Sequence, residues 1–284
     1  EEISPNVDVW ESQGKIPRAL FRQLGDLGFL GIEYPEKYGG ASADFWMTVV
    51  LAEELALCRA GGVAFSIIVH TDMSSPWLSR LGTEEQKTRY LPDIIKGEKI
   101  CALAITEPDA GSDMAGIGTT AKKDNKNWIV NGSKTFTTNG VYGDLYFVSA
   151  RTGSEGPRHR QLSQFLIEKN TPGLKVVKKL DKTGMLSSDT AELVFEDVKV
   201  PESNLLGQEN KGFYQLASGL QRERILAAVL SISAANQALE DTRTYLKTRK
   251  AFNQSLSNLQ ALRHRFADGW TQIEAARSLT YNAA

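Results

Sequence analysis

One stretch of this sequence, "TEPDAGSD" at residues 106–113, places polar and turn-forming residues directly after a short apolar run. Thr106 and Ser112 supply hydroxyls, and a turn at Gly111 leaves backbone N–H groups free to hold a phosphate or a heterocycle oxygen. A polar loop that closes a hairpin would have the same composition. Neither GxGxxG nor GxxxxGK[ST] is present here, so a Rossmann or P-loop nucleotide site is excluded at this position.

Two further stretches set an aromatic ring beside polar groups. Phe136, Thr137 and Thr138 end a predicted strand and could form a wall for a flat polar heterocycle, or simply a half-buried strand end. Arg249 and Phe252, in "TRKAF", offer a cation and an aromatic plane at the end of a predicted helix. A solvated helix end would also favour arginine, whose charge complements the helix dipole.

Glu223 lies within a helical pattern where its neighbours at helical spacing are apolar. These neighbours are Leu216, Leu220, Ala227, Leu230 and Ala234. Burial on such a face would disfavour the charged carboxylate and raise its pKa, which suits a general base near neutral pH. The alternative is a surface ion pair of Glu223 with Arg222 or Arg224. Arg224 could equally contact a phosphate.

The elements that must position these residues fall into three runs. Residues 16–97 show helical spacing, as at Leu20, Leu24 and Leu27. From Cys101 to Pro201 the chain has seven short runs rich in β-branched and aromatic residues, with no helix between them. Helical spacing then returns from Gly212.

The sequence therefore predicts an α+β multi-domain protein. We expect an amino-terminal helical domain over residues 1–98, a middle antiparallel β domain over residues 99–205, and a carboxy-terminal helical domain over residues 206–284. Within the β domain, Asn131–Gly132 is predicted to be a two-residue hairpin turn, because both central residues of such a turn need positive φ.

Composition narrows the function classes. The 284 residues are 41% hydrophobic and 24% charged, with a formal net charge of −1, which gives no field to recruit nucleic acid or an anionic membrane. The two cysteines, without CxxC spacing, and three isolated histidines argue against a disulfide framework and against a metal site. No apolar stretch reaches the length of a membrane span.

Four motifs in order resemble the acyl-CoA dehydrogenase family across essentially the whole chain. They are "TEPDAGSD", "VNGSKTFTTNG", "SSDTAELVFEDVKVP" and "ENKGFYQLASGLQRERILAA". Within that family the chain looks most like the long-chain enzymes, because "GLQRER" places a glutamate on this helix as the long-chain and isovaleryl branches do. The resemblance implies FAD bound between the β domain and the carboxy-terminal helices.

The resemblance also implies roles for single residues. FAD would contact Leu103, Ile105, Thr106, Gly111 and Ser112 in the first motif and Phe136, Thr137 and Thr138 in the second, while Arg249 and Phe252 would reach the FAD of a neighbouring subunit. The CoA thioester would contact Ser112, Ser188 and Arg224, with His159 as a further candidate. Glu223 would be the catalytic base.

The implied reaction is FAD-dependent α,β-dehydrogenation of an acyl-CoA to a trans-2-enoyl-CoA, and the expected substrates have medium-to-long straight acyl chains. Glu223 would remove the α-proton while the β-hydrogen leaves as hydride to FAD, and hydrogen bonds to the thioester carbonyl would stabilise the enolate-like charge. The implied partners are an electron-transfer flavoprotein and further copies of the chain in a homotetramer. The implied location is the mitochondrial matrix or the bacterial cytoplasm.

Some positions depart from the family pattern: Asp109, Leu186 and Asn253 replace the usual Gly, Arg and Gly. The sequence also ends before the last helices of the family, so we expect it to be a fragment. The alternatives that these residues leave open are an isovaleryl or other branched short-chain dehydrogenase, an oxidase, and a catalytically silent scaffold of the same fold.

Overall fold

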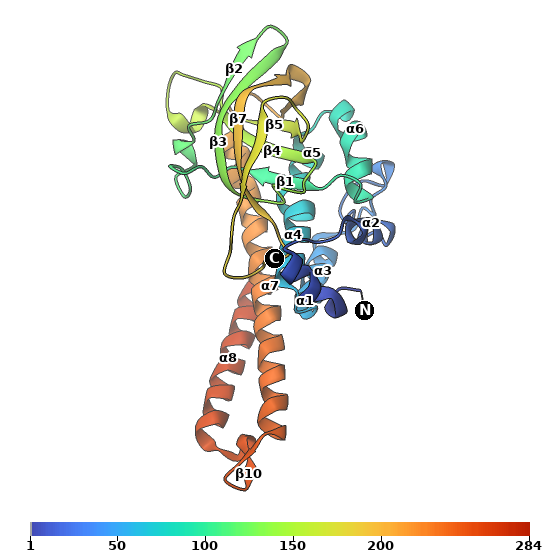
Figure 1. Ribbon diagram of the computed structural model, residues 1–284, viewed down its shortest axis with the longest axis vertical. Helices are drawn as coiled ribbons and strands as arrows, with labels where there is room; N and C mark the ends of the chain where they lie inside the picture. Colours follow the sequence, from blue (N-terminus) through green and yellow to red (C-terminus); the bar gives the residue numbers. More distant parts are fainter. Residues whose placement is uncertain (1) are drawn as a thin grey trace.

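The computed structural model describes residues 2–284 and shows three parts that follow one another along the chain (Figure 1). A group of short helices is followed by a sheet, and the sheet by a long helix that turns back as a helical hairpin. This is the predicted α+β order of helical, β and helical parts.

The first part is built from short helices with buried apolar faces. They are α1 (Val7–Gln13), α2 (Arg18–Asp26), α3 (Phe45–Leu57), α4 (Gly61–Ile68), α5 (Ser75–Leu81) and α6 (Glu84–Ile95), with 3-10 turns η1 (Ser4–Asn6) and η2 (Glu36–Tyr38) and a π-helical stretch η3 (Val69–Ser74). On α2, Leu20 and Leu24 are buried as predicted. Leu27 is 68% exposed, because the helix ends at Asp26 and the stripe ends with it.

The middle part is a sheet whose central strands are covered on both faces. Its strands are β1 (Cys101–Ala104), β2 (Thr120–Asp124), β3 (Asn127–Thr138), β4 (Leu145–Arg151), β5 (Leu162–Glu168), β6 (Leu174–Lys179), β7 (Thr190–Pro201) and β8 (Leu205–Leu206), with 3-10 turns η4 (Met114–Gly116), η5 (Arg158–Arg160) and η6 (Glu202–Asn204). On β4, Phe147 packs towards Leu91 of α6, whereas Val148 packs towards Phe165 on the other side. This alternation lets a run of apolar residues fill two cores.

The strand order within the described residues is β6-β7-β3-β2-β4-β5-β8, with β1 beside β4. Most neighbours are antiparallel, as predicted. However, β1 runs parallel to β4, and β2 meets β4 in parallel at Thr120 and Arg151. The loop from β1 to β2 is long enough to return the chain to the same end of the sheet, which a two-residue turn could not do.

The predicted hairpin at Asn131–Gly132 is wrong. Both residues lie inside β3, and the tight connection to β2 is made at Asn125, which has a φ of +53°. Gly132 instead marks a shift in register between β3 and β7, and a Cβ at this position would come 2.4 Å from Thr119 Oγ1. Glycine is needed here because Thr119, just before β2, approaches closely and because φ is +149°, and not because the chain reverses direction.

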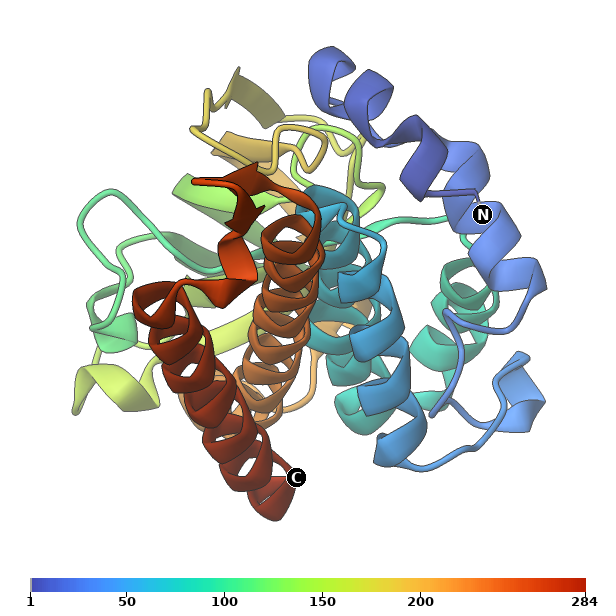
Figure 2. The ribbon, with the colours of Figure 1, turned by 90° about the horizontal axis from the view of Figure 1, so that it is seen from below.

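The last part is dominated by α7 (Gly212–Thr248), which packs against α3 and then extends away from the body (Figures 1 and 2). A small hairpin of β9 (Lys250–Ala251) and β10 (Gln254–Ser255), with turn η7 (Leu256–Asn258), reverses the chain into α8 (Gln260–Ala283), which lies along α7. Among the described residues no helix is both long and apolar enough to cross a membrane.

Candidate active site

Glu223 lies in the part of α7 that crosses the body of the protein. It borders a small cavity between α7, α5 and η3, where its neighbours include Trp77 and Gly219. Burial raises the pKa of this carboxyl to about 7 from its usual 4.5, and the charge of Arg224 only partly opposes the rise. Glu223 can therefore exchange a proton near neutral pH, as a general base must.

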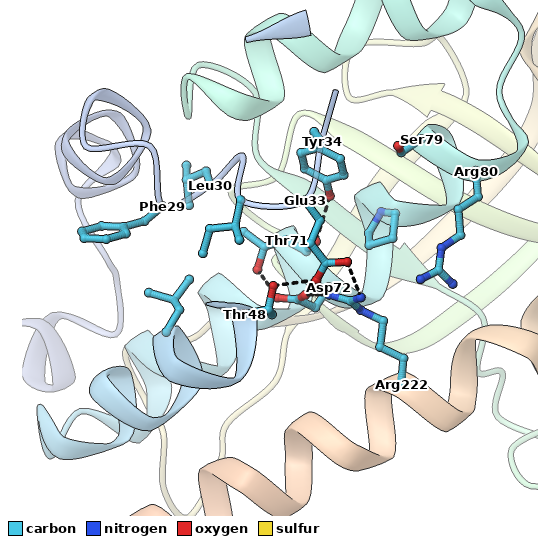
Figure 3. A pocket seen from close by; sticks show the side chains of 13 residues that line it. Phe29, Leu30, Glu33, Tyr34, Thr48, Thr71, Asp72, Ser79, Arg80 and Arg222 are labelled. Atoms are coloured by element: carbon cyan, nitrogen blue, oxygen red, sulfur yellow. Dashed lines mark hydrogen bonds and ion pairs between the residues drawn. The ribbon is translucent and has the colours of Figure 1, made fainter. Parts of the chain in front are cut away.

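The surface ion pair between Glu223 and Arg222 is not formed. The Arg222 side chain reaches instead into the helical part, where its guanidinium contacts Glu33 and lies 2.7 Å from Asp72 (Figure 3). Arg224 is exposed, and no ion pair joins it to Glu223 within residues 2–284. Sequence reasoning missed the contacts of Arg222 with Glu33 and Asp72. The partners lie 150 residues or more apart in the chain, and local periodicity carries no information about such distant pairs.

An apolar cavity of about 430 Å³ opens on the Glu223 face of α7. Small side chains of α3, α4 and α7 form much of its wall. The lining residues are Ala56, Arg59, Gly61, Ala64, Phe65, Met185, Ala227, Leu230, Ser231 and Ala234. Three of the five positions predicted to share a face with Glu223 thus line an open cavity, whereas Leu216 is buried in the core. Such a wall can hold an aliphatic chain.

The end of β1 and the end of β3 lie side by side. The backbone N–H of Thr135 donates to the carbonyl of Thr106 at 2.8 Å. Phe136 has a φ of +55° at a shift in register of β3, and its side chain is 66% exposed between buried neighbours. The structure thus places Thr106 beside the segment that holds Phe136 and the half-buried Thr138. That these residues form one ligand site stays a prediction.

The hydroxyl of Thr137 points the other way. Thr137 is fully buried, and its Oγ1 has no hydrogen-bond partner among the described residues. In the first motif, Leu103 and Ile105 are half-buried, while Gly111 and Ser112 are exposed in the loop beyond β1. A side-chain contact to a ligand on the Phe136 face is therefore open to Thr138 but not to Thr137.

A buried ion pair, which sequence reasoning missed, ties these two segments together. Lys134 Nζ lies 2.7 Å from Glu107 and 2.9 Å from the carbonyl of Ile105, and the Lys134 side chain is completely buried. Burial lowers the pKa of Lys134 to about 8, against the opposing effect of Glu107. A lysine in a strand pattern normally indicates an outward position, so only its distant partner reveals this contact.

The remaining predicted residues lie in other places. Ser188 is buried, and its Oγ has no hydrogen-bond partner among residues 2–284. The ring of His159 packs against Phe213 and Tyr214. Arg249 and Phe252 lie at the tip of the α7–α8 hairpin, 26 residues or more beyond Glu223, which is about 39 Å along a helix. They do not reach the Glu223 site of their own chain.

Comparison with known proteins places this geometry in a family. The chain matches models of the acyl-CoA dehydrogenase amino-terminal domain (residues 1–98), middle domain (residues 102–198) and carboxy-terminal domain (residues 210–284). It is 44% identical over 280 residues to the long-chain specific acyl-CoA dehydrogenase, mitochondrial, of Rattus norvegicus, which covers 98% of this chain and 64% of that protein. It is 41% identical to the isovaleryl-CoA dehydrogenase, mitochondrial, of Pongo abelii over 94% of this chain and 63% of that protein.

A solved structure agrees. The acyl-CoA dehydrogenase from Geobacillus kaustophilus superposes with a TM-score of 0.96 at 43% identity, over 99% of this chain and 73% of that one. Proteins of this family depend on FAD and act in fatty-acid oxidation. The chain spans about two thirds of the length of its mitochondrial relatives. By sequence and by fold, the chain belongs to the acyl-CoA dehydrogenase family.

Proposed function

We propose that this chain carries the base, the acyl cavity and much of the FAD site of an enzyme that dehydrogenates acyl-CoA thioesters to trans-2-enoyl-CoA. The observation that carries the proposal is the Glu223 carboxyl, which has a pKa of about 7 and lies on the face of α7 that also lines the apolar cavity. An acyl chain in that cavity would bring its α-carbon towards this carboxyl. We also propose that the three domains divide after residues 98 and 205.

The residues at the ends of β1 and β3 fit FAD. Phe136 has an exposed ring and a positive φ. A positive φ in a residue other than glycine costs of the order of 1–3 kcal/mol, and such strain clusters at ligand-binding sites. The Phe136 ring can stack on a flat heterocycle, and the hydroxyls of Thr106, Thr138 and Ser112 can bond to its polar edge and phosphates. When bound, FAD supplies the acceptor for the β-hydrogen.

The chain's own groups would do the rest of the chemistry. Glu223 would take the α-proton, and its partial burial limits the access of water to the carboxylate. Ser188, Ser112 and Arg224 would contact the CoA portion. Arg249 and Phe252, on the projecting hairpin, would reach the FAD of a neighbouring subunit in a homotetramer, and an electron-transfer flavoprotein would take the electrons.

Replacing Phe136 by alanine is expected to weaken FAD binding about three- to tenfold, because one stacked aromatic contact is worth about 0.5–1.5 kcal/mol. Quenching of flavin fluorescence during titration of the apoprotein measures the change. Phe29→Ala, which removes an exposed ring from the helical part, serves as the control and should leave the affinity unchanged. Equal affinities in Phe136→Ala and the unaltered protein would remove Phe136 from the site.

The length of the apolar cavity should determine which acyl chain lengths the enzyme accepts. Ala227 and Ala234 lie about 6 Å and 16 Å along α7 from Glu223. Ala234→Phe should lower kcat/KM for palmitoyl-CoA about 10²-fold, since about four methylenes at about 0.8 kcal/mol each lose their contacts, and should spare butyryl-CoA. Ala227→Phe should impair both substrates. Ala235→Phe, on an exposed position outside the lining, is the matched control.

Chain-length preference is the finer part of the proposal, since relatives with long-chain and with branched short-chain substrates are both similar to this chain. We favour medium-to-long straight chains because the cavity is larger than a five-carbon group needs. Turnover with palmitoyl-CoA against isovaleryl-CoA distinguishes the two. A preference for isovaleryl-CoA would overturn the long-chain assignment.

The whole proposal is tested by the colour of the purified protein. A yellow protein whose flavin absorbance bleaches on anaerobic addition of an acyl-CoA would support it. A protein that stays colourless after incubation with FAD would be a silent scaffold instead. Production of peroxide with oxygen as the only acceptor would identify an oxidase.

A further inference from the structure

In the sequence "RER" the proposed base lies between two arginines, and the contacts of Arg222 show why the first of them does not pair with it. Glu223 is flanked by two arginines on one helix, and a guanidinium in contact with its carboxylate would make it a poor base. Arg222 and Glu223 border the same small cavity, together with Asp72 and Arg80. The two side chains leave α7 about 100° apart, so only the length of the Arg222 side chain could bring its guanidinium to Glu223 across this cavity. The structure shows what holds it away.

Two carboxylates engage Arg222 from the helical part. Glu33, in the segment between α2 and α3, accepts from both terminal nitrogens, with Nη1 at 2.7 Å. Asp72, in η3, accepts from Nη2 at 2.7 Å and is only 3% exposed. The guanidinium also lies over the ring of Phe45, 4.5 Å from its centroid. Figure 3 shows the side chain reaching from α7 into this cluster.

Further hydrogen bonds fix the two carboxylates in turn. Thr48 Oγ1 donates to Glu33 at 2.6 Å, and Thr71 Oγ1 donates to Asp72 at 2.5 Å. Burial opposes ionisation of Glu33, but the hydrogen bonds and charge of Arg222 outweigh it and hold the pKa of Glu33 below its usual value. Burial dominates at Asp72 and raises its pKa, although Arg222 opposes this. The cluster has one cation for two carboxyl groups.

We propose that Glu33 and Asp72 are positioning residues for the reaction: by engaging the guanidinium of Arg222 they keep it from pairing with Glu223, so that the base retains a free carboxylate. The inference rests on the proposed function. The other charged groups around Glu223 are Asp72 itself, which borders the same cavity, and Arg80 of α5 and Arg224 of α7. Both of these arginines are exposed, so water and salt screen their charge. Arg222 is the buried cation and therefore the one that must be restrained.

The test follows the titration of Glu223 itself. In the FAD-loaded protein labelled with ¹³C at the glutamate carboxyl carbons, the Glu223 signal is assigned by its loss in Glu223→Gln. In E33Q/D72N the released Arg222 should lower the titration midpoint of Glu223 by one pH unit or more, a tenfold loss of proton affinity. Adding R222M to this variant should restore the titration midpoint of Glu223, because the guanidinium that E33Q/D72N releases is then absent.

A merely structural role, in which the cluster only anchors α7, would not give this rescue. An unchanged midpoint in folded E33Q/D72N, or a midpoint that stays low in the triple variant, would overturn the proposal. If E33Q/D72N does not fold, D72N alone decides: it should lower the midpoint, and D72N/R222M should return the midpoint to that of the unaltered protein. A D72N midpoint that does not fall, or that R222M does not restore, would count against the proposal. The titration needs no turnover, so it stands apart from the assays of the proposed function.

Discussion

Glu223→Gln is expected to reduce turnover of acyl-CoA by about 10³-fold while FAD remains bound. Glutamine has nearly the same shape but cannot take the α-proton, and a positioned general base contributes about 10²–10⁴-fold to rate. Stopped-flow measurement of flavin bleaching by palmitoyl-CoA follows this step directly. Glu223→Asp, which keeps the carboxyl but retracts it, should retain more activity than the glutamine variant. Near-normal turnover in flavin-loaded Glu223→Gln would reject Glu223 as the base.

The pH dependence of the unaltered protein follows from the same group. The base must be deprotonated, and its pKa is raised to about 7, so kcat/KM should fall about tenfold per pH unit below pH 7 and level off above it. An ordinary surface glutamate would place this limb near pH 4.5. A limb that lies close to pH 4.5 would show that the carboxyl is solvated during catalysis.

Glu223→Gln should also change stability, in a direction set by the sign of the shift. Because the pKa of Glu223 is higher in the folded protein than in the unfolded chain, folding favours the protonated form, and stability declines as pH rises from about 4.5 to 7. Glutamine removes this cost. The variant should therefore be more stable than the unaltered protein at pH 8, by of the order of 1–3 kcal/mol, and about equally stable at pH 4. Denaturant unfolding at the two pH values measures the difference.

Glu107→Gln is expected to lower the free energy of unfolding by about 3–5 kcal/mol. The substitution leaves the Lys134 ammonium buried without its counter-charge, and an unpaired buried charge is among the most costly defects in a protein. Glu107 also accepts from the N–H groups of Gly118 and Thr119, at 2.6 Å and 3.0 Å, and an amide can accept only part of this. Urea unfolding followed by circular dichroism measures the loss.

The same sheet offers a matched control. Lys175 and Glu196, on β6 and β7, form an ion pair at 2.6 Å with both side chains about 60% exposed. Glu196→Gln should cost less than about 1 kcal/mol, because water replaces the lost partner. Equal losses in Glu107→Gln and Glu196→Gln would contradict the role assigned to burial. Adding Lys134→Met to Glu107→Gln should recover part of the stability, since it removes the unpaired charge.

Flavin binding should respond to this pair as well. Lys134 holds the carbonyl of Ile105 beside Thr106 and lies two residues before Phe136, so it connects the two segments proposed to contact FAD. We expect FAD to dissociate faster from Glu107→Gln than from Glu196→Gln when the two variants are compared under conditions that give them the same free energy of unfolding. The sequence alone does not predict this role for Lys134, because an isolated lysine in a strand is normally expected to face solvent.

Local patterns in the sequence predict much of the fold. The helical spacing places Leu20 and Leu24 in a core, and the strands from Cys101 to Pro201 appear where β-branched and aromatic residues cluster. These features depend on residues a few positions apart. The wrong hairpin prediction at Asn131–Gly132 has a different origin: the glycine is required by its close contact with Thr119, 13 residues earlier and just before β2.

The sequence by itself determined the family, the order of helical and β parts, and the helix face on which Glu223 stands, because ordered motifs and periodicity are properties of neighbouring residues. Only the tertiary structure decided that Arg222 turns to Glu33 and Asp72, that Lys134 is buried against Glu107, and that Phe136 is exposed at a distorted strand end. A charge finds its partner through space, and whether it is buried depends on every element packed around it.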